Sequence, residues 1–168
     1  MTLPPQASPP KIPAFLCDEM FQRLGRWLRA AGYDVVMANE GDTDYELLRQ
    51  AIAEGRLLIT RDRELARMRR AKDTVLLMQA DTLEACAKEL AERLRVNWQF
   101  DPFSRCLQCN TLLTPATTDQ CQDVPGDIEL PVYYCPNCQQ VFWDGSHVQR
   151  MRDHLVRWRA GDFQLSLN

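Results

Sequence analysis

The sequence lacks the features of a membrane-spanning or secreted protein. Its 168 residues contain no apolar run that approaches the roughly 20 residues needed to cross a bilayer. The N-terminus has no basic segment followed by an apolar stretch, which is the pattern of a secretory signal. We therefore expect a cytoplasmic protein with reduced thiols and no membrane partner.

An excess of basic charge is also missing. The formal net charge is −3, and only three of the 20 basic residues are lysines. Residues 1–100 carry 15 basic and 15 acidic side chains, whereas residues 101–168 carry 5 and 8. Any binding to nucleic acid must therefore use local basic patches instead of a globally basic surface. The 45% hydrophobic and 26% charged residues are ordinary for a globular protein and exclude disorder throughout.

The motifs that cradle nucleotide phosphates are absent. The chain contains neither G-x-x-x-x-G-K-[ST] nor G-x-G-x-x-G. No serine or cysteine nucleophile with a partnering base stands out, and both histidines, His147 and His154, lie beyond residue 100. These absences argue against nucleotide binding by a glycine-rich loop and against a covalent hydrolase.

Proline is absent from residues 14–100, and this gap divides the chain. Five of the ten prolines fall within residues 1–13, which we interpret as an extended, disordered lead. The other five lie between positions 102 and 136, among paired cysteines. We expect a globular domain over residues 14–100, followed over residues 101–168 by a zinc ribbon with a C-terminal helix.

The proline-free segment alternates short apolar runs with amphipathic patterns. The apolar runs predict strands over residues 14–17, 34–38, 57–60 and 74–79. The amphipathic patterns predict helices over residues 19–31, 44–54, 63–70 and 81–95, the second of them opened by a capping box at Thr43 and Glu46. Alternating strands and helices imply a parallel sheet, and continuously apolar strands require a cover on both faces. The expected fold class is therefore α/β, with a parallel sheet between two helical layers.

Acidic side chains follow each predicted strand. Ligands of open parallel sheets bind at the carboxyl ends of the strands, and Asp18, Asp44, Asp62 and Asp81 would lie there, with Asp42 nearby. Carboxylates held together repel one another, and a divalent cation removes this cost. Oxygen ligands favour Mg²⁺ or Mn²⁺, which can activate water for attack on a phosphodiester.

These acids also have structural interpretations. Asp44, Asp62 and Asp81 stand where helices begin, and each could cap a helix without binding metal. Asp18 ends an apolar strand and has little evident structural role. The metal site is therefore predicted from the four acids together and not from any one of them.

Paired cysteines predict a structural zinc site. Two C-x₂-C motifs supply four thiolates for tetrahedral coordination, which leaves no open position for water; they comprise Cys106, Cys109, Cys135 and Cys138. The long spacer between them leaves room for a hairpin around residues 124–127. Cys121 in that spacer is expected to be a spare thiol, and Cys17 and Cys86 to be small core residues.

Basic side chains cluster in two places beside the acids. Residues 61–72 carry a net charge of +4, including Arg61, Arg63 and Arg67. A second stripe, one turn after Asp18, comprises Arg23, Arg26 and Arg29. Both clusters could hold an RNA backbone, because guanidinium groups grip phosphate oxygens. The alternative is two solvated helix faces with local ion pairs.

Several of these segments together resemble a known family. They are FLCDEMFQRLGRWLRAAGYDV from residue 15, DYELL from 44, EGRLLITRD from 54, and CPNC with FWDGSHVQRM between 135 and 151. Over roughly residues 14–155 they resemble the PIN-like ribonuclease domain named after the C-terminal part of Mut-seven proteins, with its zinc ribbon.

The resemblance implies a PIN-like three-layer α/β/α fold and metal-dependent cleavage of RNA. By position, Asp18, Asp44 and Asp62 take the acidic metal-binding roles, with Asp81 as a further candidate, and the G-S-H setting of His147 makes that residue an RNA-contact candidate. An alternative function is a non-catalytic adaptor that binds RNA, acting on a ribosome, a tRNA or a protein complex. A toxin-like nuclease is a third. The sequence does not define an oligomeric state.

Overall fold

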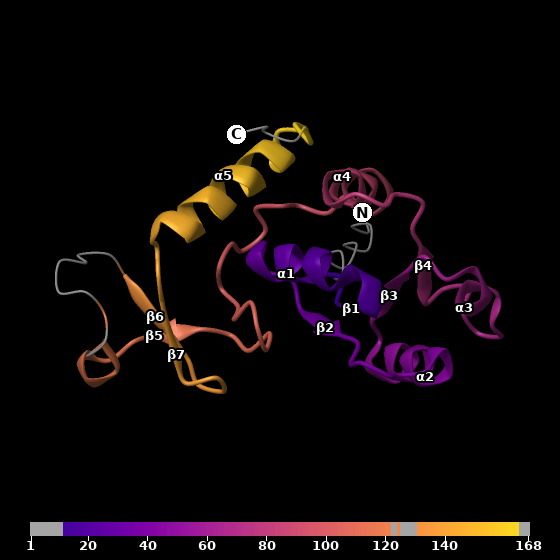
Figure 1. The fold of residues 1–168 in the computed structure, drawn as a ribbon, viewed down its shortest axis with the longest axis horizontal. Helices are drawn as coiled ribbons and strands as arrows, with labels where there is room; N and C mark the ends of the chain where they lie inside the picture. Colours follow the sequence, from indigo (N-terminus) through magenta and orange to yellow (C-terminus); the bar gives the residue numbers. More distant parts are fainter. Residues whose placement is uncertain (1–11, 122–123, 125–130, 165–168) are drawn as a thin grey trace, which may run out of the picture.

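A computed structural model describes residues 12–121, 124 and 131–164 of the chain (Figure 1). The lead expected to be disordered over residues 1–13 lies almost entirely outside the described residues. The hairpin expected around residues 124–127 also falls outside them, apart from a single position.

Four short parallel strands form the central sheet. They are β1 (Phe15–Cys17), β2 (Val35–Met37), β3 (Leu57–Thr60) and β4 (Val75–Leu77). Their order across the sheet is β2-β1-β3-β4, and every pairing is parallel. Strands β1 and β3 are therefore the two central ones, and the carboxyl ends of all four meet at one edge of the sheet.

Helices connect successive strands. They are a 3₁₀ turn η1 (Glu19–Phe21) leading into α1 (Gln22–Ala30), then α2 (Asp44–Glu54), α3 (Arg63–Arg67) and α4 (Leu83–Leu94). The predicted capping box is confirmed, since the Thr43 side chain accepts from the Glu46 amide and Glu46 reciprocates. Helix α3 is shorter than expected, because residue 68 already leaves the helical conformation.

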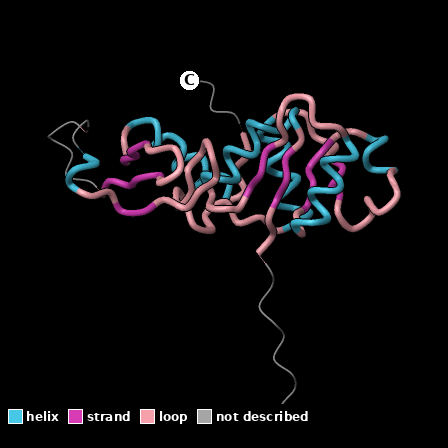
Figure 2. The backbone as a smooth tube through the Cα atoms, turned by 90° about the horizontal axis from the view of Figure 1, so that it is seen from below, coloured by secondary structure: helices cyan, strands magenta, loops and turns pink. Residues whose placement is uncertain are grey.

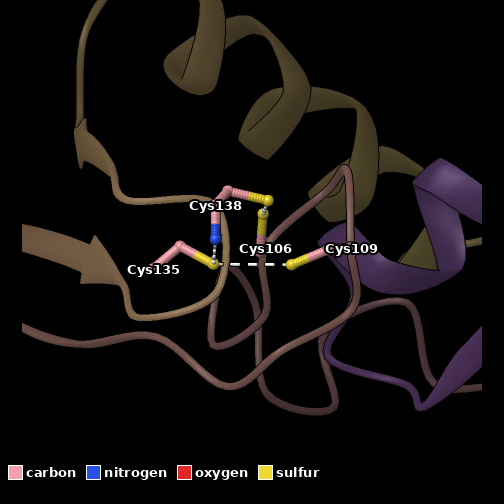
Figure 3. A group of neighbouring side chains, drawn as sticks. All are labelled: Cys106, Cys109, Cys135 and Cys138. Atoms are coloured by element: carbon pink, nitrogen blue, oxygen red, sulfur yellow. Dashed lines mark hydrogen bonds between the residues drawn. The ribbon is translucent and has the colours of Figure 1, made fainter.

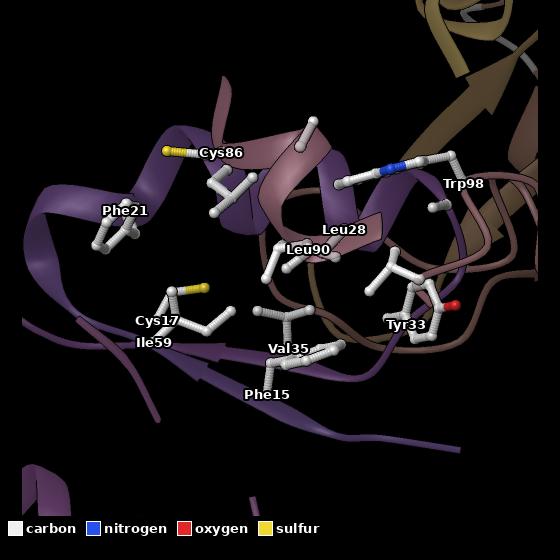
Figure 4. Packing of buried hydrophobic residues seen from close by; sticks show 14 of the residues in the cluster. Phe15, Cys17, Phe21, Leu28, Tyr33, Val35, Ile59, Cys86, Leu90 and Trp98 are labelled. Atoms are coloured by element: carbon white, nitrogen blue, oxygen red, sulfur yellow. The ribbon is translucent and has the colours of Figure 1, made fainter. Parts of the chain in front are cut away.

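Helices cover both faces of the sheet, because side chains of successive strand residues point to opposite sides. Phe15 and Cys17 pack with α1 and α4, in a cluster drawn in Figure 4. Leu16 and Leu58 pack instead with α2 and α3. The two separate clusters make a three-layer α/β/α arrangement, so the predicted fold class is confirmed.

The C-terminal part contains a small antiparallel sheet and a helix. The sheet has the order β5-β6-β7, and its elements are β5 (Thr114–Pro115), β6 (Val132–Cys135) and β7 (Gln140–Trp143), with a 3₁₀ turn η2 (Thr118–Cys121) after β5. Helix α5 (Ser146–Arg159) follows. Figures 1 and 2 show the small sheet standing beside the α/β layers, while α5 reaches back over α1.

Helix α5 completes the larger core. Its buried residues Met151, Leu155 and Trp158 belong to the same cluster as the inner faces of α1 and α4. The Trp158 ring lies 4.9 Å from Trp27 and 4.8 Å from Trp98, measured between ring centroids. One core thus joins side chains from both sides of position 100.

Candidate active site and metal centre

A buried threonine links two of the candidate acids. Asp18 directly follows β1, and Asp62 lies two residues after Thr60, which ends the neighbouring strand β3. The Thr60 hydroxyl, 0% exposed, donates to Asp18 Oδ2 at 2.6 Å and accepts the Asp62 amide at 2.9 Å. Sequence reasoning missed Thr60 as a site residue, although a polar residue at the end of the apolar run LLIT is the signal that could have found it.

Asp44 is the third acid at this edge. It opens α2 and is exposed, whereas the cap of that helix comes from Thr43. Partial burial, followed by the negative charges of Asp62 and Asp18, raises the pKa of the Asp44 carboxyl. Asp44 therefore lies close enough to Asp62 and Asp18 to interact with their charges, and a divalent cation relieves repulsion of this kind.

The acids at the edge do not form a closed cage. Among the described residues, three or more potential metal ligands come within 4.8 Å of one another only in the group of four cysteines. Asp18, Asp44 and Asp62 stand further apart than that. Their oxygens suit Mg²⁺ or Mn²⁺ by chemistry, so the fit of a cation rests on the donor type and on the mutual repulsion of the acids.

Asp18 and Asp62 also serve the local backbone. Asp18 Oδ1 accepts the Glu19 amide at 2.6 Å and so caps η1, which makes the expectation of little structural role wrong. Asp62 Oδ1 accepts the amides of Glu64 and Leu65 at 2.7 and 3.1 Å and caps α3. In Asp62 both capping bonds use the same oxygen, so capping does not occupy the whole carboxylate.

Asp81 lies apart from this group. It follows the edge strand β4, is exposed, and is not among the charges that shift Asp44. The expectation that Asp81 begins the following helix is wrong, because Thr82 caps α4 by accepting the Ala85 amide. Asp81 instead lines a pocket of about 180 Å³ together with Arg23 and Arg61.

The predicted basic residues divide into exposed and engaged ones. Arg23, Arg26, Arg61 and Arg63 are exposed. Arg67 is exposed as well but pairs with Glu64 at 2.7 Å, the local ion pair that the alternative interpretation expects.

Arg29 does not belong to an exposed basic face. Its side chain is 5% exposed and donates to backbone carbonyls on two segments: to Val35 at 2.8 and 2.9 Å, and to Leu107 and Gln108 at 3.0 and 2.6 Å. The expectation that Arg29 is part of a solvent-facing stripe is therefore wrong. Arg29 instead ties the loop between Cys106 and Cys109 to the α/β layers.

The two histidines have different surroundings. His147 is exposed near the start of α5. Together with Arg23 and Arg26 it lines a groove between α1 and the start of α5. His154 packs its ring 5.5 Å from that of Trp27, and its Nδ1 lies 3.0 Å from the Arg150 carbonyl oxygen. The histidine packed against Trp27 therefore has a structural role, and His147 is accessible to a ligand.

The four paired cysteines converge on one point, as Figure 3 shows. The sulfurs of Cys109 and Cys135 lie 3.4 Å apart, and those of Cys106 and Cys138 lie 3.9 Å apart. With zinc–sulfur bonds of about 2.3 Å, tetrahedral coordination spaces sulfurs by about 3.8 Å. The quartet could therefore hold a metal ion such as zinc.

Protonation of the thiols also fits a metal site. Despite partial burial, hydrogen bonds from Thr111 and from the facing cysteine knuckle lower the pKa of the Cys109 thiol to about 5. Hydrogen bonding with Cys109, reinforced by burial and by the thiol of Cys106, raises the pKa of the Cys138 thiol to about 12. Thiols that share protons in this way release them when a metal binds.

The remaining cysteines behave as expected. Cys121 lies outside the quartet, and Cys17 and Cys86 are buried core residues. Burial raises the pKa of the Cys17 thiol to about 12 and that of Cys86 to about 11, so neither thiol is reactive at neutral pH.

An asparagine and an ion pair also hold the first knuckle against the sheet. Asn110 accepts the Val35 amide at 3.0 Å and donates to Asp34 at 2.7 Å. Asp34 in turn pairs with Arg56 at 2.7 Å. Burial alone would raise the pKa of the Asp34 carboxyl, but the hydrogen bonds from Arg56 and Asn110 and the charge of Arg56 hold it below its usual range.

Fold and site together define an α/β protein with an acidic sheet edge and four clustered cysteines that could hold a metal ion. Residues 13–155 match the family described as the Mut7-C RNAse domain, and the chain belongs to that family. Over 113 residues it is also 31% identical to a human protein named "Exonuclease mut-7 homolog". These relationships support a nuclease-type function.

The relationship to the human protein is partial. The matched region covers 62% of this chain but only 13% of that relative's length. No solved structure gives a significant match. In the part of the chain that the structure describes, no helix is both long and apolar enough to cross a membrane.

Proposed function

We propose that this protein is a metal-dependent ribonuclease whose Mg²⁺ or Mn²⁺ site is formed by Asp18, Asp44 and Asp62. The observation that carries the proposal is that the Thr60 hydroxyl bonds both the Asp18 carboxylate and the Asp62 backbone amide at the ends of neighbouring strands. Partial burial and the charges of Asp62 and Asp18 raise the pKa of Asp44 beside them. Membership of a ribonuclease-domain family supports RNA as the substrate. Asp81 is assigned an accessory role beside Arg61.

The chain's own groups provide orientation and charge. Thr60 fixes the direction of the Asp18 carboxylate, and the bonds to the Glu64 and Leu65 amides fix that of Asp62. A bound divalent ion supplies Lewis acidity and an acidified water. Exposed arginines hold the phosphates of the RNA near this edge, and they comprise Arg23, Arg26, Arg61, Arg63 and Arg67, together with His147.

The cysteine quartet is assigned a structural zinc. All four ligands are thiolates, so coordination is saturated and the ion has no open position for catalysis. On this proposal the nuclease chemistry lies in residues 14–100, and residues 101–168 form a zinc ribbon with a C-terminal helix. The protein would act in the cytoplasm.

The test is cleavage of a mixture of labelled RNAs with and without added Mn²⁺. Asp18→Asn and Asp62→Asn should each lower the rate by about 100-fold or more, as expected when stabilisation of developing charge is removed. Asparagine caps helices as well as aspartate does, so both variants should fold. Asp73→Asn is the matched control, because Asp73 is exposed at the opposite end of the strands. Equal activity in all four proteins would overturn the proposal.

A non-catalytic adaptor for RNA, including tRNA or a ribosome, is the second candidate. The observation that favours it is that Asp18 and Asp62 already have capping roles, which would retain them without any metal. An adaptor would bind RNA with the same affinity in the wild type and in Asp18→Asn, and neither protein would cleave it.

A further inference from the structure

A groove of about 700 Å³ lies between α1, the first cysteine knuckle and the start of α5. Its lining includes Arg23, Arg26 and His147, all exposed, and the buried Arg29. No aspartate or glutamate is among its lining residues. The groove is therefore positively charged in a chain whose net charge is negative.

One wall of the groove belongs to the four-cysteine module. Leu107 and Gln108, between Cys106 and Cys109, line it opposite α1. Arg29 holds the carbonyls of both residues, at 3.0 and 2.6 Å. The knuckle thus has a fixed position as a groove wall. The carbonyls that hold Arg29 are uncharged, but the thiolates of Cys106 and Cys109 lie close enough to interact with its charge. The positive charge of the groove therefore rests on the exposed Arg23 and Arg26.

The groove leads toward the acidic edge. Ala38 and Asn39, which directly follow β2, line one end of it. Strand β2 is parallel to β1, whose carboxyl end carries Asp18, so these residues share the edge where the acids lie. Arg23 also lines the pocket that holds Arg61 and Asp81. Arg23 therefore lies between the two cavities and lines both.

An aromatic ring is also available in the groove. Trp27 lines it and is half-buried, and its ring is backed by Trp158 and His154 at 4.9 and 5.5 Å. Single-stranded nucleic acids bind where a basic groove carries aromatic rings on which bases stack. An acidic peptide would satisfy the charges but would have no flat base to place on Trp27.

We propose that this groove binds a single-stranded segment of RNA and guides it past Arg23 to the acidic edge. The zinc knuckle is then part of the RNA-binding surface as well as a staple for its own fold. The proposal rests on the proposed ribonuclease function, and it identifies single-stranded RNA as the form of substrate that this site accepts.

The test measures binding of fluorescent oligouridylate to full-length, zinc-loaded Asp18→Asn protein without added Mg²⁺ or Mn²⁺. An oligomer of about 12 nucleotides is within the site sizes of single-strand-binding proteins and should bind more tightly than one of about 4. Arg26→Gln should weaken the longer oligomer about two- to fivefold, as for an exposed ion pair. It should also reduce the slope of log affinity against log salt by about 0.7.

Arg159→Gln is the matched control. Arg159 is exposed at the far end of α5, about 20 Å along that helix from its start. This variant should leave both the affinity and the salt slope unchanged. Arg23→Gln provides a second groove variant, and melting temperatures and zinc content exclude misfolding.

Two results would overturn the groove proposal. One is unchanged affinity in both Arg26→Gln and Arg23→Gln. The other is competition by a polyglutamate peptide as strong as that of the RNA, which would assign the groove to an acidic protein segment. RNA cleavage with Mn²⁺ is measured separately. If the wild type cleaves RNA but Arg26→Gln and Arg23→Gln bind it as tightly as the wild type, only the groove proposal is wrong. If the groove variants weaken binding but no protein cleaves RNA, only the nuclease proposal is wrong.

Discussion

At the residue scale, single polar side chains connect the structure of the sheet edge to its chemistry. Thr60 is fully buried and serves Asp18 and Asp62 at once. Asp18 and Asp62 in turn each cap a helical turn, and both are proposed ligands of the metal site. A substitution here therefore acts on stability and on the site together, and the two effects need separate variants.

Thr60→Val and Thr60→Ser together test the role of the Thr60 hydroxyl. Valine fills the same space but leaves Asp18 Oδ2 and the Asp62 amide without their partner, which costs about 1–3 kcal/mol of unfolding free energy. Thr60→Ser keeps a hydroxyl and should retain most of the activity that the valine variant loses. Urea denaturation and RNA cleavage measure the two effects. Wild-type activity in the valine variant would show that the bridge does not orient Asp18.

Asp34 should make the free energy of unfolding fall as the pH is lowered. Its folded-state pKa is depressed below the unfolded value of about 3.9, so ionised Asp34 stabilises the fold above that pH. The contribution disappears as pH falls through the depressed folded value. Asp34→Asn should therefore be less stable than the wild type at pH 7 and equally stable at the acid end.

Urea midpoints of the two proteins across this pH range measure the difference, with Asp73→Asn as an exposed control. The effect should be modest, because the Asp34 side chain is 37% exposed. A stability gap that stays constant with pH would contradict the assignment of the shift to Arg56 and Asn110.

At the element scale, local signals are readable from the sequence and distant contacts are not. The capping box at Thr43 and Glu46 is complete within four residues, and the structure has it as predicted. The prediction for Arg29 fails because its partners at 107 and 108 lie almost 80 positions away. No helical periodicity contains that information.

The same contrast holds for the candidate sites. The paired cysteines follow from spacing alone, since a C-x₂-C turn brings two sulfurs together wherever it folds. The position of Asp81 depends instead on strand order, which puts β4 at the edge of the sheet and Asp81 beside Arg61. Thr82 and not Asp81 caps α4, and the sequence does not decide between these neighbours because both residue types cap helices.

A substitution at Gly32 tests how closely the end of α1 approaches the loop at Asp101. It adopts φ +100°, and a Cβ there would lie 2.3 Å from the Asp101 carbonyl oxygen. Gly32→Ala should therefore lower the unfolding free energy by more than the roughly 1 kcal/mol of backbone strain alone.

Gly161→Ala is the matched control for Gly32→Ala. Gly161 adopts φ +86°, but a Cβ there would have nothing within 4 Å, so only the backbone strain applies. Thermal or urea denaturation compares the two variants. Equal destabilisation would mean that the loop at Asp101 moves aside without cost.

At the scale of the whole molecule, the four-cysteine module and the α/β layers pack into one structure. Trp158 and Leu155 complete the core beneath α1, and Arg29 and Asn110 fasten the first knuckle to the sheet. The apolar cluster on the α2 and α3 face of the central sheet nevertheless contains only residues before position 100. Loss of zinc should therefore destabilise the four-cysteine module while the central sheet stays folded.

Hydrogen exchange on zinc-loaded and chelator-treated protein measures this. Exchange should rise in residues 106–113 and 132–143 and change little in β1 and β3. Cys135→Ser should reproduce the effect of the chelator, and Cys121→Ser should not, because Cys121 is outside the quartet. Hydrogen exchange that is unchanged on removal of zinc, or that rises throughout the central sheet, would contradict the assignment of a structural zinc to the module.

Carboxylates that follow separate strands are proposed to form a divalent-cation site, and Mn²⁺ titration followed by electron paramagnetic resonance detects binding at that site without requiring catalysis. With the cysteines filled by zinc, the wild type should bind Mn²⁺, and Asp18→Asn and Asp62→Asn should each weaken binding by about tenfold or more. Asp73→Asn should bind as the wild type does. Absence of Mn²⁺ binding, or equal binding in all four proteins, would contradict the account.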